Sequence, residues 1–166
     1  FSLIEKAKSV PQRIVLPEGS EERVLKAADI LLRRSVAGIV LLGNPAAIQS
    51  KAAQLGLDLE TAEIIDPLAS PLYEDYATTY AELRAHKRIT PEMAHDIMAD
   101  PIYFGTMMVY KGHADGMVAG SKTTTAHTIR PAFEFIKTKP DASIVSSVFL
   151  MCLKDRVLAF GDCAVN

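Results

Sequence analysis

Cysteine is scarce in this sequence of 166 residues, which contains only Cys152 and Cys163. Two cysteines cannot form a disulfide framework, and their spacing matches no CxxC pair with histidines nearby, so the sequence predicts no zinc site. Free cysteine is usually a small buried hydrophobic residue, and we therefore expect two reduced, structural thiols. No other metal site is predicted.

The sequence also lacks a basic excess and any long apolar run. Its 18 Lys and Arg residues stand against 20 Asp and Glu, which gives a net charge of −2 and a pI near 6.1. A nucleic-acid-binding surface normally carries excess positive charge, so no nucleic acid partner is expected. The longest apolar runs, such as 37–43, fall well short of the roughly 20 residues that cross a bilayer. The amphipathic start is no signal peptide, so we expect a cytoplasmic protein without membrane contact.

What the chain does have is the composition of a globular core, with 49% hydrophobic and 23% charged residues. Short β-rich runs at 12–17, 37–43 and 62–66 alternate with segments of helical periodicity, and a fourth run follows at 115–120. Continuous apolar strands between helices are typical of a parallel sheet covered on both faces. The predicted fold class is therefore α/β, with a parallel sheet flanked by helices.

Capping residues mark the expected helix starts. Ser20 is predicted to cap the helix in SEERVLKAADILLRRS, which would place Arg23 at its third position. Three later starts combine a cap with a first-turn proline: Asn44-Pro45, Thr90-Pro91 and Asp100-Pro101. The last of these opens IYFGTMMVY, which is apolar on all sides and is therefore expected to be a buried helix.

The alternation of strands and helices stops near residue 140. Beyond it, SIVSSVFLMCL and RVLAFGD have the pattern of two strands joined by a turn at 154–155, with no crossover helix between them. We predict a first α/β domain over 1–140 and the start of a second, truncated α/β domain over 141–166. Because the chain begins at Phe1 rather than methionine, we also expect a piece of a longer polypeptide.

A hydroxyl-rich segment, AGSKTTTAHTIRP, spans 119–131 between the fourth strand and the next helix. Such a turn presents unpaired backbone N–H groups at the positive end of the helix dipole, and an arginine adds paired, charge-assisted hydrogen bonds to a phosphate or carboxylate. Pro131 is expected to keep Arg130 out of the α conformation and to turn its side chain out of the helix line. The segment predicts an anion site, while hydroxyl-rich turns that serve only as caps are the alternative.

Two nucleotide-binding motifs are excluded. The stretch GSKTT resembles the end of the P-loop pattern GxxxxGK[ST], but Ser121 stands where that pattern, counted from Gly116, requires its second glycine. No GxGxxG follows the first strand, so the dinucleotide-binding fingerprint is absent too.

Arg84, in AELRAHKR, is the second candidate for binding an anion. It lies at the edge of the apolar stripe of its predicted helix. The alternative is an ordinary solvated arginine among basic neighbours.

Nine blocks of the sequence occur in the same order in phosphate acetyltransferases: LPEGSEERVLKAA, VLLGNPAAI, EIIDP, ELRAHKRIT, DGMVAG, TTAHTIRP, IKTKP, SSVFLM and FGDCAVN. The chain resembles the first half of that family's catalytic region over essentially all of its length. The resemblance implies two α/β domains of the isocitrate/isopropylmalate dehydrogenase-like type, with the active site in the cleft between them. It also implies reversible acetyl transfer between acetyl phosphate and coenzyme A, with coenzyme A as a substrate, no cofactor and no metal.

The resemblance also implies residue roles. Arg130 and Arg84 fall on motif arginines associated with the cleft and its phosphate-bearing substrates, and they are the predicted catalytic residues. The predicted substrate-binding residues are Thr124, Thr125, Ser121 and Arg23. The two threonines match a hydroxyl pair near the acetyl phosphate, and Arg23 matches a position linked with coenzyme A.

Some family features are altered or absent. Members often have His where this chain has Thr123, and Asp or Asn where it has His127, so the contribution of these two side chains is open. The family's general base, an aspartate, and a serine–arginine pair lie in the half that this chain lacks, so we expect the chain alone to be inactive. A homo-oligomer is expected for the complete enzyme.

Two other functions remain as alternatives. A phosphate butyryltransferase would share these motifs, because the acyl pocket cannot be sized from the sequence. A non-catalytic, acyl-CoA-sensing domain like that of some malic enzymes is the other, although such domains tend to lose the arginine–proline pair found here at 130–131.

Overall fold

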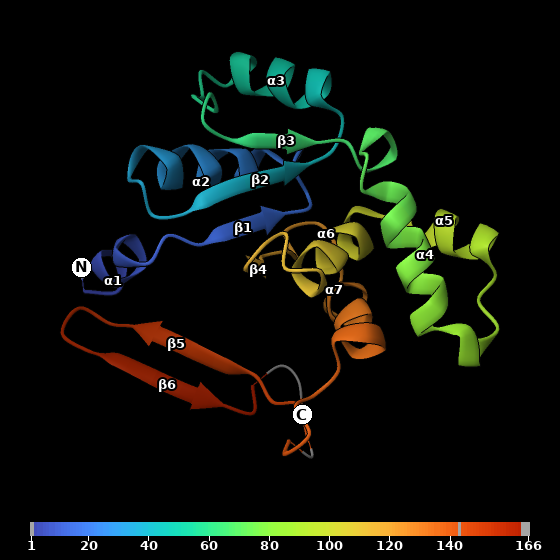
Figure 1. Ribbon diagram of the computed structural model, residues 1–166. Helices are drawn as coiled ribbons and strands as arrows, with labels where there is room; N and C mark the ends of the chain where they lie inside the picture. Colours follow the sequence, from blue (N-terminus) through green and yellow to red (C-terminus); the bar gives the residue numbers. More distant parts are fainter. Residues whose placement is uncertain (1, 143, 164–166) are drawn as a thin grey trace. The chain divides into compact units, whose positions relative to one another are not determined.

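A computed structural model describes residues 2–142 and 144–163 (Figure 1). The chain divides into two compact units, Phe1–Phe135 and Ile136–Asn166. The strands are β1 (Arg13–Leu16), β2 (Gly38–Leu42), β3 (Glu63–Ile65), β4 (Gly116–Met117), β5 (Val148–Cys152) and β6 (Val157–Gly161). The α-helices are α1 (Ser2–Ser9), α2 (Glu22–Arg33), α3 (Pro45–Gln54), α4 (Tyr73–Leu83), α5 (Pro91–Met98), α6 (Pro101–Tyr110) and α7 (Thr125–Pro131). Short 3₁₀ helices η1 (Pro67–Ala69) and η2 (Ala85–Lys87) and a π-helical turn η3 (Ala132–Ile136) complete the elements.

The first unit contains a parallel sheet with the strand order β3-β2-β1-β4. The chain builds the sheet outward from β1 to β3 and then returns to the other side of β1 to form β4. The predicted α/β class with a parallel sheet is confirmed, although β4 is a two-residue strand rather than the run expected over 115–120. In open parallel sheets, ligands bind where the strand order reverses, at the carboxyl ends of the strands. Here that place is the pair β1 and β4.

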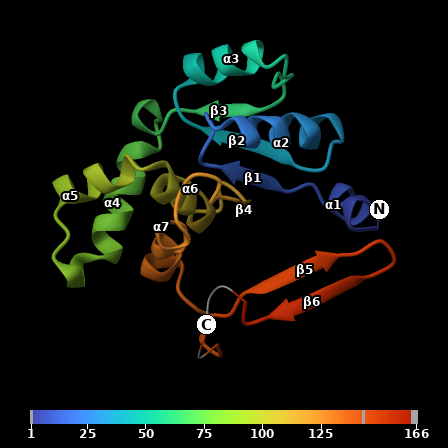
Figure 2. The same ribbon diagram turned by 180° about the vertical axis from the view of Figure 1, so that it is seen from behind.

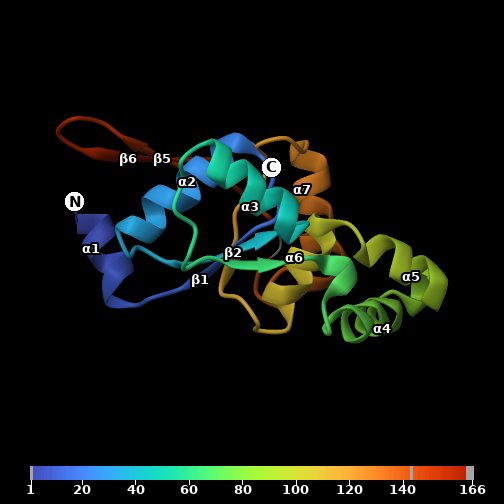
Figure 3. The same cartoon turned by 90° about the horizontal axis from the view of Figure 1, so that it is seen from above.

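Helices cover both faces of this sheet, because alternate residues of its strands point to opposite sides. Leu16, Ile39 and Leu41 pack with the buried faces of α2 and α3. Val15, Val40 and Leu42 pack with residues of α4, α5 and α6 on the other side. Figure 3 shows α2 and α3 on one face of the sheet, and Figures 1 and 2 show α4 and α5 side by side. Each fully buried Leu, Ile or Val contributes about 1.5–3 kcal/mol, so both layers hold the sheet in place.

Helix α6 is buried, as its uniform hydrophobicity predicts, and every residue from Ile102 to Met108 is in the protein interior. Asp100 caps it through hydrogen bonds from the N–H groups of its first turn. A Cβ atom at Gly105 would lie only 3.1 Å from a Val15 methyl group and 3.0 Å from the Met117 sulfur. The glycine therefore allows α6 to pack directly against β1 and β4.

The predicted cap of α2 is wrong. The helix begins at Glu22, and Glu21 is at the capping position without a side-chain hydrogen bond. The N–H of Glu21 donates to the carbonyl of Glu18 at 3.0 Å, so Ser20 lies inside a tight turn rather than at the helix start. Arg23 is consequently the second residue of α2 and not the third.

The second unit contains an antiparallel hairpin of β5 and β6, with Val148 opposite Gly161 and Cys152 opposite Val157 (Figure 2). The strand pair and its turn near 154–155 agree with the prediction. Both strands are exposed along their whole length. Cys152 and Cys163 are free and exposed, so the expectation that they are buried thiols is wrong. Within the described residues, no helix is long and apolar enough to cross a membrane.

Candidate active site

The candidate site lies where the loops after β1 and β4 meet, at the carboxyl ends of two neighbouring parallel strands. Glu18 follows the end of β1 by two residues, and the hydroxyl-rich segment likewise begins two residues after the end of β4. The N–H of Val118 donates to the carbonyl of Val15 at 2.9 Å, which extends the contact between the two strands. The sheet therefore brings together two segments that are about a hundred residues apart in the sequence.

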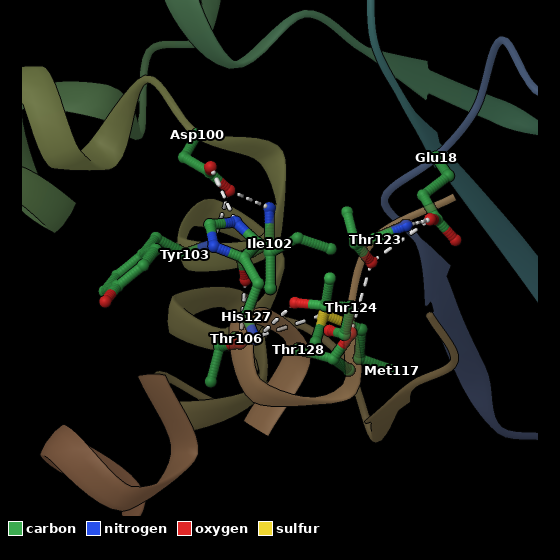
Figure 4. A network of polar contacts seen from close by, with 10 residues as sticks. All are labelled: Glu18, Asp100, Ile102, Tyr103, Thr106, Met117, Thr123, Thr124, His127 and Thr128. Atoms are coloured by element: carbon green, nitrogen blue, oxygen red, sulfur yellow. Dashed lines mark hydrogen bonds and ion pairs between the residues drawn. The ribbon is translucent and has the colours of Figure 1, made fainter. Parts of the chain in front are cut away.

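The carboxylate of Glu18 accepts four consecutive backbone N–H groups. Gly120 and Ser121 donate to Oε2 at 3.0 and 2.8 Å, and Lys122 and Thr123 donate to Oε1 at 2.6 and 2.8 Å. The hydroxyl of Thr123 donates to Oε1 as well, at 3.1 Å (Figure 4). The N–H groups of this 120–123 turn were expected to be unpaired. Instead, they are hydrogen-bonded to an anion of the protein, the carboxylate of Glu18.

These hydrogen bonds favour the charged form of Glu18. Burial acts to raise the pKa of its carboxyl group, but the N–H groups of Lys122, Thr123 and Ser121 and the Thr123 hydroxyl outweigh burial and lower that pKa. The group is therefore a carboxylate near neutral pH. Hydrogen bonds to an ionised acceptor are roughly twice as strong as neutral ones, so the 120–123 turn is firmly held.

Arg23 binds a carbonyl group of the same turn. Its guanidinium donates to the carbonyl of Ser121 at 2.7 Å, and its Nε lies 3.5 Å from the carboxylate of Glu21. The side chain of Arg23 is 74% exposed. Glu18, Arg23 and Ser121 also line a largely apolar pocket of about 590 Å³ beside α2. The structure thus brings together two of the predicted substrate-binding residues, Arg23 and Ser121.

The threonines after this turn begin α7. The hydroxyl of Thr124 accepts from the N–H of His127 at 3.2 Å and so caps the helix, while Thr125 is its exposed first residue. The hydroxyls of Thr123 and Thr128 lie 3.2 Å apart. Capping, the alternative function of these hydroxyls, is therefore observed for Thr124.

Asp100 connects α6 with α7. One of its carboxylate oxygens accepts from the N–H of Ile102 at 2.8 Å, and the other lies 2.9 Å from Nε2 of His127 (Figure 4). The ring of His127 also meets the edge of Tyr103, with ring centroids 6.2 Å apart. His127, which departs from the family pattern, thus has a carboxylate partner in this chain.

Arg84 follows the last residue of α4, and its side chain is only 17% exposed. The alternative of a solvated arginine is therefore excluded. A guanidinium nitrogen lies 3.9 Å from one carboxylate oxygen of Glu134, while the hydroxyl of Tyr80 donates to the other at 2.7 Å. Nε of Arg84 is buried and has no hydrogen-bond partner among the described residues. Leaving a buried donor unpaired costs about 1–3 kcal/mol, so this nitrogen is a polar group that a further hydrogen-bond acceptor would stabilise.

Arg130 lies in the last turn of α7 and is exposed. It is helical, so the expectation that Pro131 excludes it from the α conformation is wrong: the ring of Pro131 is fully buried, and its packing outweighs a backbone preference. Within the described residues Arg130 makes no ion pair. Burial, and next the charge of Glu134, raise the pKa of Tyr103 to about 12, while the charge of Arg130 opposes this rise.

The predicted residues fall into two groups. Arg23 and Ser121 surround the 120–123 turn, whereas Arg84 and Arg130 lie beside Tyr80 and Tyr103, whose rings meet edge to face at 5.9 Å. The helix start at Thr124 lies between the groups along the chain. Within the described residues, no cluster of three His, Cys, Asp or Glu side chains could hold a metal ion.

Sequence reasoning missed three carboxylates of this region, which are Glu18, Asp100 as a partner of His127, and Glu134. The only local signal for Glu18 was a charged residue placed between a strand and Gly19. Glu134 could have been suspected from its place four residues after Arg130 on a helix.

The comparisons with known proteins all indicate the same family. Residues 2–166 match the family described as phosphate acetyl/butaryl transferase. The chain is 64% identical over its whole length to a phosphate acetyltransferase of Nitratidesulfovibrio vulgaris, of which it covers 24%. It is 52% identical over 99% of its length to one of Corynebacterium glutamicum, of which it covers 50%. The chain therefore spans between a quarter and a half of the length of these relatives.

Two solved structures resemble the fold closely. A phosphotransacetylase from Staphylococcus aureus superposes with a TM-score of 0.89 at 41% sequence identity, over 99% of this chain and 49% of its own. One from Streptococcus pyogenes gives a TM-score of 0.91 at 37% identity, over 99% of this chain and 50% of its own.

Proposed function

This chain belongs to the phosphate acetyl/butaryl transferase family, and we propose that it forms part of an enzyme that transfers an acetyl group reversibly between acetyl phosphate and coenzyme A. The observation that carries the proposal is the 64% identity to a phosphate acetyltransferase over all 166 residues. The relatives reported above are named for acetyl rather than butyryl transfer, which favours the acetyl group as the substrate.

The proposed reaction is an attack on the carbonyl carbon of acetyl phosphate by the sulfur of coenzyme A. The thiol loses its proton to a base, because the thiolate is the nucleophile. A C–S bond forms, the C–O bond to phosphate breaks, and phosphate leaves with the electron pair. The family's aspartate base belongs to the half that this chain lacks, so the chain contributes to binding and charge stabilisation rather than to proton removal.

Arg84 and Arg130 are the proposed contacts of the phosphate-bearing substrates. The guanidinium of Arg84 has an unpaired buried Nε, and that of Arg130 is free of ion pairs in the described part of the chain. A phosphate oxygen would satisfy these donors and receive charge-assisted, paired hydrogen bonds. Such preorganised donors stabilise the charge that develops on the leaving phosphate.

The remaining roles are assigned in the same way. Thr124 and Thr125 are proposed to lie near the acetyl phosphate, with Ser121 in the turn before them, and Arg23 is proposed to bind coenzyme A. His127, paired with Asp100, would change the hydrogen bonding available beside these threonines.

Several finer features are also proposed. The complete enzyme would have two domains of the isocitrate/isopropylmalate dehydrogenase-like type, divided near residue 140, and would form a homo-oligomer in the cytoplasm. Its substrates would be acetyl phosphate and coenzyme A, with no further cofactor.

The role of Arg130 is tested by substitution in the full-length protein that contains this chain. Arg130→Ala should lower the rate of acetyl-CoA formation by about tenfold or more, since removal of one preorganised donor lowers kcat by roughly 10²–10³-fold in enzymes with oxyanion holes. The melting temperature should stay near that of the wild type, because the side chain is exposed and makes no ion pair with the described residues.

The matched control for this substitution is Arg34→Ala. Arg34 is an exposed arginine at the end of α2, away from the carboxyl ends of the strands, and its loss should leave the rate unchanged. Equal rates for Arg130→Ala and the wild type at saturating substrates would remove Arg130 from the catalytic residues.

A further inference from the structure

We propose that Glu18 is a positioning residue of this site, whose carboxylate fixes the 120–123 turn and thereby the start of the segment that carries Thr124 and Thr125. The inference rests on the proposed function, which assigns substrate binding to that segment but gives no role to Glu18. It also implies that the backbone N–H groups of the turn donate to the protein's own carboxylate and do not bind the substrate.

The hydrogen bonds of Glu18 require a carboxylate. Each of its two oxygens accepts two N–H groups, and Oε1 accepts the Thr123 hydroxyl in addition. A glutamine has one acceptor oxygen, and its NH₂ group would point a donor at two N–H donors. A turn of four consecutive N–H groups is an anion-binding concavity, and here it is occupied.

The backbone around Glu18 is itself held in place. The N–H of Gly19 donates to the carbonyl of Leu42 at the end of β2, at 3.2 Å. A Cβ atom at Gly19 would come within 2.5 Å of that same carbonyl oxygen, so only glycine fits without a shift. The carboxylate thus projects from a loop that is fixed to the sheet.

The turn continues directly into the helix start, because Thr124 follows Thr123 in the chain. The hydroxyls of Thr123 and Thr128 lie 3.2 Å apart. The Thr123 hydroxyl also lies 3.1 Å from Glu18, and the Thr128 hydroxyl 3.1 Å from the carbonyl of Thr124 (Figure 4). Each hydroxyl has one proton, so two of these three contacts are hydrogen bonds at any time.

A substrate phosphate consequently finds no free N–H group in the 120–123 turn. Arg23 also occupies the carbonyl of Ser121, so both the donors and an acceptor of the turn are engaged within the protein. Within the turn, only side chains are left to contact a phosphate. The turn therefore serves to position the threonines that follow it.

The test uses the full-length protein in three variants: Glu18→Gln, Glu18→Asp and the control Glu22→Gln. Glu22 lies four residues further along the chain, at the start of α2, but its carboxylate is 45% exposed and forms an ion pair with Lys26 at 2.7 Å. An exposed pair of this kind contributes little to stability. Melting temperatures establish that each variant is folded.

The first measurement is amide hydrogen exchange, followed by mass spectrometry in peptides that contain residues 120–123. Glu18→Gln should raise the exchange rate of these amides by about tenfold, since hydrogen bonds to a charged acceptor are lost. Glu18→Asp, which keeps both oxygens, should lie between Glu18→Gln and the wild type, and Glu22→Gln should match the wild type. Unchanged exchange in Glu18→Gln would show that the carboxylate does not hold the turn.

The second measurement is the kinetics of acetyl-CoA formation. A positioning role predicts a KM for acetyl phosphate that rises by about tenfold in Glu18→Gln, a smaller change in kcat, and partial rescue by Glu18→Asp. Faster exchange with an unchanged KM would overturn the role in substrate binding. A wild type that forms no acetyl-CoA would refute the proposed function, while the exchange measurement would still decide whether Glu18 fixes the turn.

Discussion

The charged residues of this region differ in whether the protein itself provides their hydrogen-bond partners. Glu18 and Asp100 both accept hydrogen bonds from backbone N–H groups, which keeps each carboxylate at a defined place. Arg84, by contrast, has a buried Nε without a partner in the described part of the chain, and its nearest carboxylate, on Glu134, is 3.9 Å away. Glu18 and Asp100 are thus hydrogen-bonded within the protein, whereas Arg84 has a donor without a partner among the described residues.

The lowered pKa of Glu18 predicts how stability depends on pH. The carboxyl group has a lower pKa in the folded protein than its ordinary value of 4.5. Its stabilisation is therefore fully present above about pH 4.5 and is lost as the pH falls through the folded value. The difference in free energy of unfolding between the wild type and Glu18→Gln should shrink over that acidic range.

Urea denaturation of both proteins at a series of pH values measures this difference. Glu22→Gln is the control, because the carboxylate of Glu22 is bound by the exposed side chain of Lys26 rather than by a backbone turn. A difference between wild type and Glu18→Gln that stays constant from neutral to strongly acidic pH would contradict the assignment.

At the residue scale, the sequence indicated the hydroxyl-rich segment but not the carboxylate that binds it. The partner of the Gly120 N–H is Glu18, 102 residues earlier, and no local pattern encodes such a contact. Arg84 and Arg130 were anion-binding candidates from the sequence, but their catalytic role came only from the resemblance, since an arginine beside a helix stripe is equally consistent with a solvated side chain. The burial of Arg84 follows from the packing of Glu134 and Tyr80, which the sequence alone does not specify.

At the scale of elements, most helix starts follow directly from capping residues. Asn44, Thr90 and Asp100 each accept a hydrogen bond from the first turn of the helix they precede, and each is followed by proline. These starts could be predicted because a cap depends on neighbours within three residues. Ser20 shows the limit of this rule, since the tight turn between β1 and α2 displaces the helix start by one position.

Two equivalent caps allow stability and activity to be separated. Thr124 and Thr90 both accept from a backbone N–H, at 3.2 and 3.3 Å. Thr124→Ala and Thr90→Ala should each lower the free energy of unfolding by about 1 kcal/mol. Only Thr124→Ala should also slow acetyl transfer, because Thr90 lies at the start of α5 and outside the candidate site.

Denaturation curves and initial rates of acetyl-CoA formation for the two variants provide the comparison. Equal loss of stability with equal loss of activity would show that Thr124 acts only as a cap. Loss of activity confined to Thr124→Ala supports its placement near the acetyl phosphate.

At the scale of the molecule, the parallel sheet places the site at a predictable edge. Alternating strands and helices indicated an α/β protein with helices on both faces, because buried parallel strands are apolar throughout. They did not indicate the strand order β3-β2-β1-β4, since the pattern of each strand is compatible with several neighbours. That strand order places Glu18 next to the 120–123 turn. The sequence therefore indicated the turn but not its contact with Glu18.

The account as a whole is tested most directly by the rate of acetyl-CoA formation from acetyl phosphate and coenzyme A. The rate is measured for the full-length protein and, in parallel, for the isolated chain of 166 residues. We predict steady acetyl-CoA formation by the full-length protein and none above the enzyme-free blank by the isolated chain, which lacks the proposed base. A full-length protein that forms no acetyl-CoA, or an isolated chain that turns over at a comparable rate, would contradict the account.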